Sequence, residues 1–324
     1  MPSKYIKGSK HITGQSQKGQ AVPNFTEDQA REFFEVRRWP NGVTCAHCES
    51  ANVYRLQGKS HRPGLFECRD CKGHFTVTVG TVMEDTHLTL AQWAKAFHLM
   101  ASSKKGMSAL QIQRNLGLGS YRTAWFLCHR IRLAMKAEPI AGMLKGDVQV
   151  DEAYIGGKPR PGSPDQRGKG ITKKTPVMVL VETGGRAVSQ PLEKVQIKTI
   201  KPLLEEHIHQ TARIVTDEKP AYVKASKGFS GGHARVNHNA GEYVGADGIN
   251  TNTAESYFAL IKRGHYGTYH QMSKRHLHRY CDEFAFRWNG RTLTDAERRD
   301  AAIVGSEGKR LMYKEPMGNA ADGT

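Results

Sequence analysis

The 324-residue sequence contains no uninterrupted apolar stretch close to the roughly 18–20 residues that a helix needs to cross a bilayer. We therefore expect no membrane-spanning segment. The first twenty residues are mostly Lys, Gly, Ser and Gln, so we expect no secretory signal peptide and a cytoplasmic location.

Cysteine is also scarce, with six residues in the whole chain. Four of them fall in two close pairs, and Cys128 and Cys281 stand alone within helical patterns. This usage disfavours a disulfide framework and fits a metal site in a reducing compartment.

Acidic residues are few relative to basic ones: 31 Asp and Glu stand against 48 Lys and Arg, a formal net charge of +17. A field of that sign attracts polyanions, so nucleic acid or an anionic membrane surface is the expected kind of partner. The positive charge could also serve only to keep the chain soluble. The motifs below favour nucleic acid.

The two cysteine pairs, Cys45-x2-Cys48 and Cys68-x2-Cys71, are separated by nineteen residues. Each pair forms a tight turn that can bind one ion, and two pairs complete the four-sulfur shell typical of Zn²⁺. Because such a shell has no open coordination position, we expect the zinc to be structural. Five basic side chains suit the module to phosphate contact, although zinc ribbons also bind proteins: Arg55, Lys59, Arg62, Arg69 and Lys72. Three histidines nearby are expected to be surface residues: His47, His61 and His74.

Helical patterns surround this module. Thr26 and Gln29 form a capping-box sequence, and Pro40 and Gly42 end the helix that follows. A strand-like alternation runs over residues 75–79. Helices are then predicted from Thr89 and over about 108–116 and 121–135, with a glycine-containing turn between the last two. This outline resembles a helix-turn-helix, and it is equally typical of plain helical packing.

Short β-type runs follow at residues 148–150, 177–181, 187–190 and 213–216, with a helix after Gln196. Further helices are predicted from Asn252 and over about 276–288. This order predicts a mixed α/β sheet domain over about 145–295. The last thirty residues or so show no strong pattern.

Three acids in this domain are candidate metal ligands. Asp151 and Asp217 each come after an apolar run, where we expect the strands to end, and Glu255 opens a helix. Carboxylates suit Mg²⁺ or Mn²⁺, and two such ions can activate an attacking oxygen and stabilise a leaving oxygen at one phosphodiester. Lys262 lies two helical turns after Glu255 on the same face, where a cation can hold a DNA phosphate.

Each acid also has a plainer explanation. The aspartates are typical of strand-end turns, and Asn252 with Glu255 fits a helix cap with its reciprocal glutamate. Glu152 and Glu218 are alternative ligands, ranked second because their side chains would point to the other face if the strands continue. Asp147 and Asp165 are expected to be turn residues.

Five motifs are distinctive in combination. They are DEAYIGGK from Asp151, TDEKPAY from Thr216, VNH ending at His238, NTAESYFALIKRGHYGTY from Asn252, and RYCDEFAFRW from Arg279. With these motifs the chain resembles, over roughly residues 25–295, the DDE-type bacterial insertion-sequence transposases that carry an N-terminal zinc ribbon. This ISXO-like group is related to the eukaryotic Merlin transposons.

The resemblance implies a ribonuclease-H-like core, Mg²⁺-dependent cleavage at transposon ends, and a homo-oligomer assembled on DNA. Matched by motif, Asp151, Asp217 and Glu255 would be the catalytic, metal-binding triad and Lys262 its basic companion. Because the third position is an asparagine in parts of the family, Asn252 is the alternative to Glu255. His238 matches a family histidine of less certain role.

The segment from Arg263 to Arg291 mixes basic and aromatic side chains. By their spacing, Phe284, Phe286 and Trp288 are expected in the core. The candidates for phosphate contact are Arg263, His265, Lys274 and Arg275.

Together these observations predict an α/β protein with five segments. They are a flexible basic tail (1–25), a zinc ribbon (26–80), a helical DNA-binding region (81–140), a ribonuclease-H-like catalytic domain (141–295) and a C-terminal tail (296–324). The expected function is that of a DNA transposase in the bacterial cytoplasm, associated with the nucleoid and acting on terminal inverted repeats and target DNA. The alternatives are a non-catalytic DNA-binding regulator derived from a transposase, and a ribonuclease on the same fold.

Overall fold

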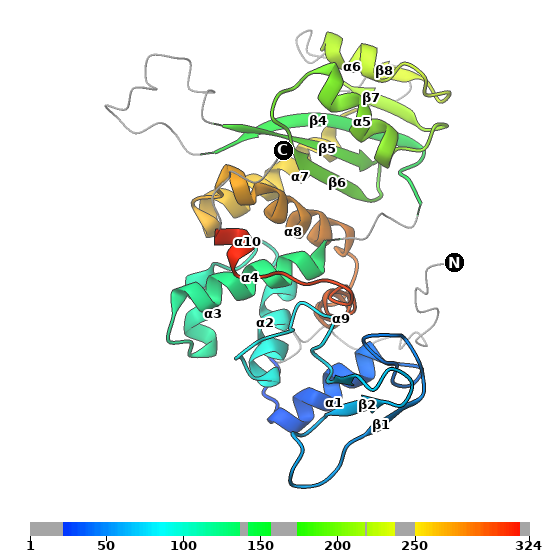
Figure 1. Cartoon of the computed structure of the whole chain (residues 1–324). Helices are drawn as coiled ribbons and strands as arrows, with labels where there is room; N and C mark the ends of the chain where they lie inside the picture. Colours follow the sequence, from blue (N-terminus) through cyan, green and yellow to red (C-terminus); the bar gives the residue numbers. More distant parts are fainter. Residues whose placement is uncertain (1–21, 137–141, 157–173, 218, 237–249, 318–324) are drawn as a thin grey trace, which may run out of the picture.

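The computed structural model describes residues 22–136, 142–156, 174–217, 219–236 and 250–317 (Figure 1). Within them a small zinc-ribbon module, a group of helices and a sheet domain follow one another along the molecule. The tail expected over 1–25 lies almost wholly outside the described residues, as do Asp165, Glu218 and His238.

The first module combines helix α1 (Glu27–Arg38) with a three-stranded antiparallel sheet of β1 (Val53–Arg55), β2 (Phe66–Cys68) and β3 (His74–Phe75). The predicted capping box is present: the side chain of Thr26 accepts from the N–H of Gln29, and the Gln29 side chain accepts from the N–H of Thr26. The strand predicted over 75–79 is wrong beyond Phe75. The chain turns there, with Val79 N–H bonded to the Thr76 carbonyl, and the buried Val77 satisfies the apolar pattern without a strand.

The middle of the molecule is built from α2 (Leu90–Ser102), α3 (Ala109–Leu116), α4 (Tyr121–Met135) and α9 (Asp295–Val304). The predicted helices are confirmed, and Gly117 ends α3 in the left-handed conformation with φ 64°. The tail expected from 296 is wrong over α9, which packs against α1, α2 and α4 and buries Ala302 and Ile303. A short α10 (Lys314–Met317) follows.

The sheet domain has five strands in the order β6-β5-β4-β7-β8. Strands β4 (Asp147–Ile155), β5 (Thr175–Glu182) and β6 (Ala187–Pro191) are antiparallel neighbours. Strands β7 (Arg213–Thr216) and β8 (His233–Arg235) run parallel to β4. The predicted mixed α/β domain is therefore confirmed.

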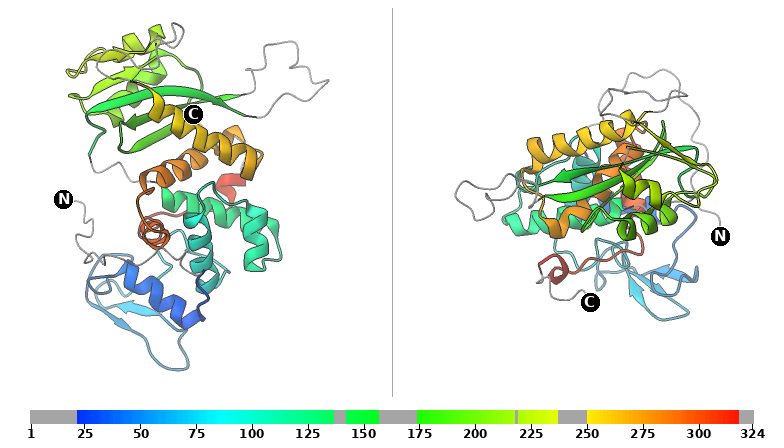
Figure 2. Two further views of the ribbon diagram at one scale, coloured as in Figure 1. Left: turned by 180° about the vertical axis from the view of Figure 1, so that it is seen from behind. Right: turned by 90° about the horizontal axis from the view of Figure 1, so that it is seen from above.

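Helices cover both faces of this sheet. On one face α5 (Ile197–His207) and α6 (Pro220–Ala225) pack against Val148 and Val150 of the central strand. On the other face lie α7 (Asn252–Gly264), the π-helical turn η4 (His265–Tyr269), the short η5 (Lys274–His276) and α8 (Leu277–Asn289). Figure 2 shows α7 and α8 between the sheet and the helices α2–α4.

Gly264 allows α7 and α8 to pack closely against each other on this face of the sheet. A Cβ on Gly264 would lie 2.3 Å from the ring of Phe284, so only glycine fits between α7 and α8. As predicted, Phe284 is buried in the core, and Phe286 and Trp288 are partly buried against it. Among the described helices, none combines the length and apolar character needed to cross a bilayer.

Candidate metal centre and acidic site

The four paired cysteines form one cluster. All four Sγ atoms lie within 4.8 Å of one another, and the Cys45–Cys71 and Cys48–Cys68 pairs are each 3.6 Å apart. A tetrahedral Zn²⁺ with Zn–S bonds of about 2.3 Å places its sulfurs about 3.8 Å apart, whereas a disulfide requires about 2.05 Å. The cysteines are all free thiols, and their spacing fits zinc.

Both Cys-x-x-Cys pairs adopt the same turn, which is why the sulfurs converge. Glu49 N–H donates to the Cys45 carbonyl at 3.0 Å, and Lys72 N–H donates to the Cys68 carbonyl at 2.9 Å. Glu49 and Lys72 have positive φ values of 61° and 58°, so each turn closes in the left-handed region. The three nearby histidines are not part of the cluster. The four thiolates complete the shell, so the site is structural.

Asp151 lies inside the central strand of the sheet. The expectation that its strand ends at Val150 is wrong, because β4 continues to Ile155 and pairs with β5 along that whole length. Side chains alternate along a strand, and Val148 and Val150 face α5 and α6. Asp151 therefore faces α7, on the same side as Ala153 and Ile155.

Asp217 follows β7, the parallel neighbour of β4. Gln149 of β4 is in register with Val215 of β7, so Asp151 and Asp217, each two residues further on, are level with one another. Burial, with added repulsion from Glu152 and Asp217, raises the pKa of Asp151 to about 6. The structure thus brings these two carboxylates together.

The first turn of α7 lies on the same face of the sheet. The N–H of Ala254 donates to the Gln149 side-chain oxygen at 3.0 Å, two residues before Asp151 in β4. The reading of Asn252 as a helix cap is wrong, because Asn252 is the first residue of the helix and Thr251 precedes it as the cap. Asn252, Glu255 and Lys262 are all exposed.

Glu255 does not join the two aspartates in a close group. Among the described residues, the cysteine cluster is the only set of three or more His, Cys, Asp or Glu side chains whose ligand atoms come within 4.8 Å of one another. Asp151 and Asp217 thus interact electrostatically, and Glu255 and Asn252 lie in the first turn of α7.

Comparison with known proteins agrees with both parts of this architecture. Residues 143–289 match the model of the ISXO2-like transposase domain, and residues 25–74 match that of the transposase zinc-ribbon domain. Together the two matches cover more than half of the chain. The chain belongs to the ISXO2-like DDE transposases. Its five-stranded mixed sheet is the ribonuclease-H-like core of that family.

A relative is also found in a transposable element of another organism. The transposase is 28% identical over 250 residues to a protein of Halobacterium salinarum described as an uncharacterized protein in transposable element ISH50. The match covers 74% of this chain and 83% of that protein.

Two of the other acids that the sequence offered, Glu152 and Asp147, have structural partners. Glu152 of the transposase points to the α6 face, where its carboxylate binds Lys219 and Tyr222. Asp147 is not the turn residue that was expected. It begins β4 and receives two hydrogen bonds from the Arg213 guanidinium, at 2.7 and 2.6 Å.

The candidates for phosphate contact divide into two kinds. Arg263, Lys274 and Arg275 are exposed on the surface of the transposase. His265 is only 4% exposed, so the expectation that it contacts phosphate is wrong. It belongs to the buried side of the π-helical turn, where burial lowers its pKa.

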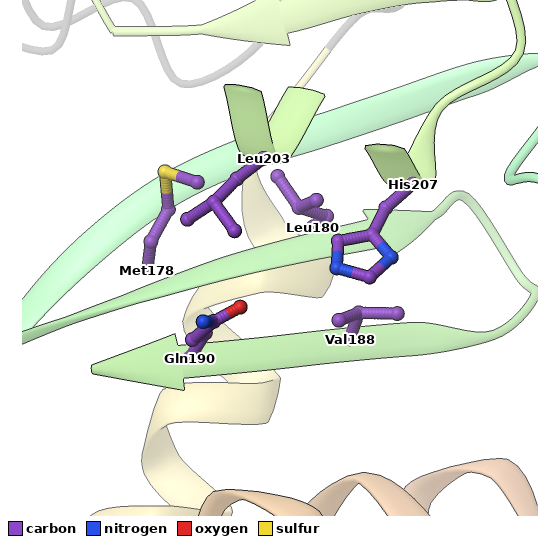
Figure 3. Close-up of a pocket in the computed structure, with 6 residues that line it drawn as sticks. All are labelled: Met178, Leu180, Val188, Gln190, Leu203 and His207. Atoms are coloured by element: carbon purple, nitrogen blue, oxygen red, sulfur yellow. The ribbon is translucent and has the colours of Figure 1, made fainter. Parts of the chain in front are cut away.

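A shallow depression lies on the opposite face of the sheet, between β5, β6 and α5 (Figure 3). Its lining is mostly apolar and consists of Met178, Leu180, Val188, Gln190, Leu203 and His207. Met178 and Leu180 belong to the core shared with α5, whereas Asp151 faces α7. The depression is therefore separate from the acidic site.

Sequence reasoning missed two residues of the acidic site, Lys219 and Tyr222. Both stand in the TDEKPAY motif, at two and five residues after Asp217. The motif was a signal that these positions matter. Only the fold shows that Lys219 contacts both Asp217 and Glu152, and that Tyr222 contacts Glu152.

Proposed function

We propose that this transposase cleaves DNA at the ends of its element and joins those ends to target DNA, with Mg²⁺ or Mn²⁺ bound by Asp151, Asp217 and Glu255. The observation that carries the proposal is the parallel register of β4 and β7, which places the backbone of Asp217, just after β7, level with Asp151 in β4. Intact acids at this place favour a catalytic protein over a regulator that only binds DNA.

The residues present fit a divalent cation. Asp151 and Asp217 are oxygen donors that interact electrostatically, and burial together with these negative neighbours raises the pKa of Asp151. A dication relieves that excess of negative charge. When bound, such ions activate the attacking oxygen and stabilise the leaving oxygen at a phosphodiester.

The chain's own side chains have separate roles in this proposal. Asp151 and Asp217 hold the metal from the sheet, and Glu255 approaches from α7, with Asn252 as the alternative third ligand. Lys262 is exposed two turns further along α7 and holds the phosphate of the DNA strand.

DNA also contacts the parts of the chain that precede the catalytic domain. Most of α4 is buried, but its first turn is open, and Tyr121 is 51% exposed next to the exposed Arg122. The start of the second helix is where helix-turn-helix proteins approach DNA. We assign DNA contact to this turn and to the basic surface of the zinc ribbon, and we expect the protein to assemble as a homo-oligomer on DNA.

The test uses the purified full chain, Mg²⁺, and duplex DNA that carries the terminal repeats of its own element. We expect nicked and joined products from the native chain. We expect none from Asp151→Asn or Asp217→Asn, although both variants still bind the DNA. Full cleavage by Asp151→Asn would refute the assignment.

Two other outcomes correspond to other functions. DNA binding by the native chain without cleavage and without Mn²⁺ binding would support a non-catalytic regulator. Faster cleavage of a matched RNA–DNA hybrid than of duplex DNA would support a ribonuclease.

A further inference from the structure

A chain of polar contacts connects Glu152 to Asp217 through the body of the sheet domain. The side chain of Glu152 is only 1% exposed, and it accepts hydrogen bonds from the Lys219 ammonium and the Tyr222 hydroxyl. The Lys219 ammonium also pairs with Asp217 Oδ2 at 3.0 Å, and the Lys219 N–H donates to Asp217 Oδ1 at 3.2 Å. Lys219 therefore holds both oxygens of Asp217.

Asp217 needs such an anchor because β7 ends at Thr216. Asp151 is held by its pairing with Val179 of β5, whereas the pairing of β7 with β4 ends at Val215 and its pairing with β8 ends at Thr216. Sheet pairing therefore does not fix the position of the Asp217 carboxylate. Contacts with neighbouring residues must do so instead.

The contacts of Glu152 with Lys219 and Tyr222 are stabilised by the burial of the Glu152 carboxylate. A buried carboxylate without a partner is costly, so Glu152 retains Lys219 and Tyr222. Tyr222 is fully buried on α6, and burial together with the nearby Glu152 raises its pKa, which keeps the hydroxyl protonated as a donor. An ionised carboxylate offers about four lone-pair positions, so Asp217 can accept from Lys219 and still bind a metal.

We propose that Glu152, Lys219 and Tyr222 form a strut that positions Asp217 beside Asp151 for metal binding. The inference rests on the proposed function, in which these two aspartates bind a divalent ion. The charges of Glu152 and Lys219 cancel, so the strut adds no net charge to the site. Its contribution is to the position of Asp217.

That charge balance makes the proposal testable by the double variant Glu152→Gln/Lys219→Met, which leaves the formal charge of the site unchanged. Mn²⁺ binding to the full-length protein, with its zinc retained, is measured by isothermal titration calorimetry, and circular dichroism reports folding. We expect about tenfold weaker Mn²⁺ binding, the size of effect typical of residues that orient metal ligands. Unchanged affinity in the folded double variant overturns the strut.

Tyr222→Phe provides a second test that removes only one hydroxyl. It is expected to weaken Mn²⁺ binding severalfold in the native background and to have no further effect on top of Asp217→Asn, because the strut acts through Asp217. A loss of equal size in both backgrounds contradicts the proposal. If the Glu152→Gln/Lys219→Met variant does not fold, this pair of measurements decides.

Asp151→Asn and Asp217→Asn separate this inference from the proposed function. If neither substitution weakens Mn²⁺ binding, the metal site itself is wrong, and the strut with it. If both weaken Mn²⁺ binding while the strut variants bind as the native protein does, only the strut is wrong.

Discussion

Arg132 of α4 and Glu283 of α8 form a buried ion pair, with 2.7 Å between Nε and Oε2 and side chains that are 2% and 0% exposed. Arg287 and the Tyr269 hydroxyl bond the other oxygen of Glu283. Arg287 also donates to the Met100 carbonyl of α2 at 2.8 Å. This network joins the helical region to the layer that carries α7.

Removal of Glu283 is expected to be severely destabilising. Glu283→Ala leaves Arg132 and Arg287 buried without their carboxylate, and such a loss costs about 3–5 kcal/mol in the free energy of unfolding. Urea unfolding followed by circular dichroism measures the effect. Asp28→Ala is the matched control, because its pair with Arg31 is exposed and is expected to contribute no more than about 1 kcal/mol. Equal effects of the two substitutions would contradict the buried network.

The same network predicts a loss of stability in acid. Burial alone would raise the pKa of Glu283, but Arg132 and Arg287 outweigh it and hold the pKa below its ordinary value. The stability contributed by ionised Glu283 is therefore complete at neutral pH and is lost as the pH falls through the lowered folded-state pKa. Glu283→Gln is expected to flatten this acid dependence of the free energy of unfolding. A variant with the native acid profile would show that other groups cause it.

The zinc site predicts one zinc ion per chain and a local loss of structure without it. Cys68→Ser is expected to abolish zinc binding and to lower the melting temperature, because the small three-stranded sheet has little core of its own. Inductively coupled plasma mass spectrometry counts the zinc. Cys281→Ala is the control, since Cys281 is buried in α8, and it is expected to retain one zinc per chain.

The open first turn of α4 predicts a change in the salt dependence of DNA binding. If Arg122 contacts one phosphate, Arg122→Ala lowers the slope of log K against log salt by about one unit. Fluorescence anisotropy with labelled terminal-repeat DNA at several salt concentrations measures that slope. Lys201→Ala on α5 is an exposed basic control that should leave the slope unchanged. An unchanged slope for Arg122→Ala would remove this turn from the DNA surface.

The third ligand is decided by a pair of substitutions on α7. We expect Glu255→Gln to abolish cleavage and Mn²⁺-dependent activity while DNA binding persists, because the amide keeps the shape and removes the charge. Asn252→Ala is expected to retain measurable cleavage. The reverse result, with Asn252→Ala inactive and Glu255→Gln active, would assign the third position to Asn252.

Much of the fold could be predicted because its signals are local. The two-residue spacing within each cysteine pair is a local signal: it forms a tight turn suited to metal binding, independently of distant residues. The Thr26–Gln29 capping box and the helical periodicity of α2 act within a few residues. Helix α9 shows the same kind of signal, a capping box of Thr294 and Glu297 that the sequence reading overlooked.

The sequence by itself determined the residue types that the proposed chemistry requires: four cysteines that suit zinc, and the aspartates and glutamate that suit a hard metal ion. The tertiary structure decided where they stand. Asp151 lies within a strand because β5, distant in sequence, extends the pairing to Ile155. His265 is buried in the π-helical turn, and Glu152 of β4 meets Lys219, the residue that precedes α6. Strand length, burial and ion pairing depend on partners far along the chain, and no local pattern contains them.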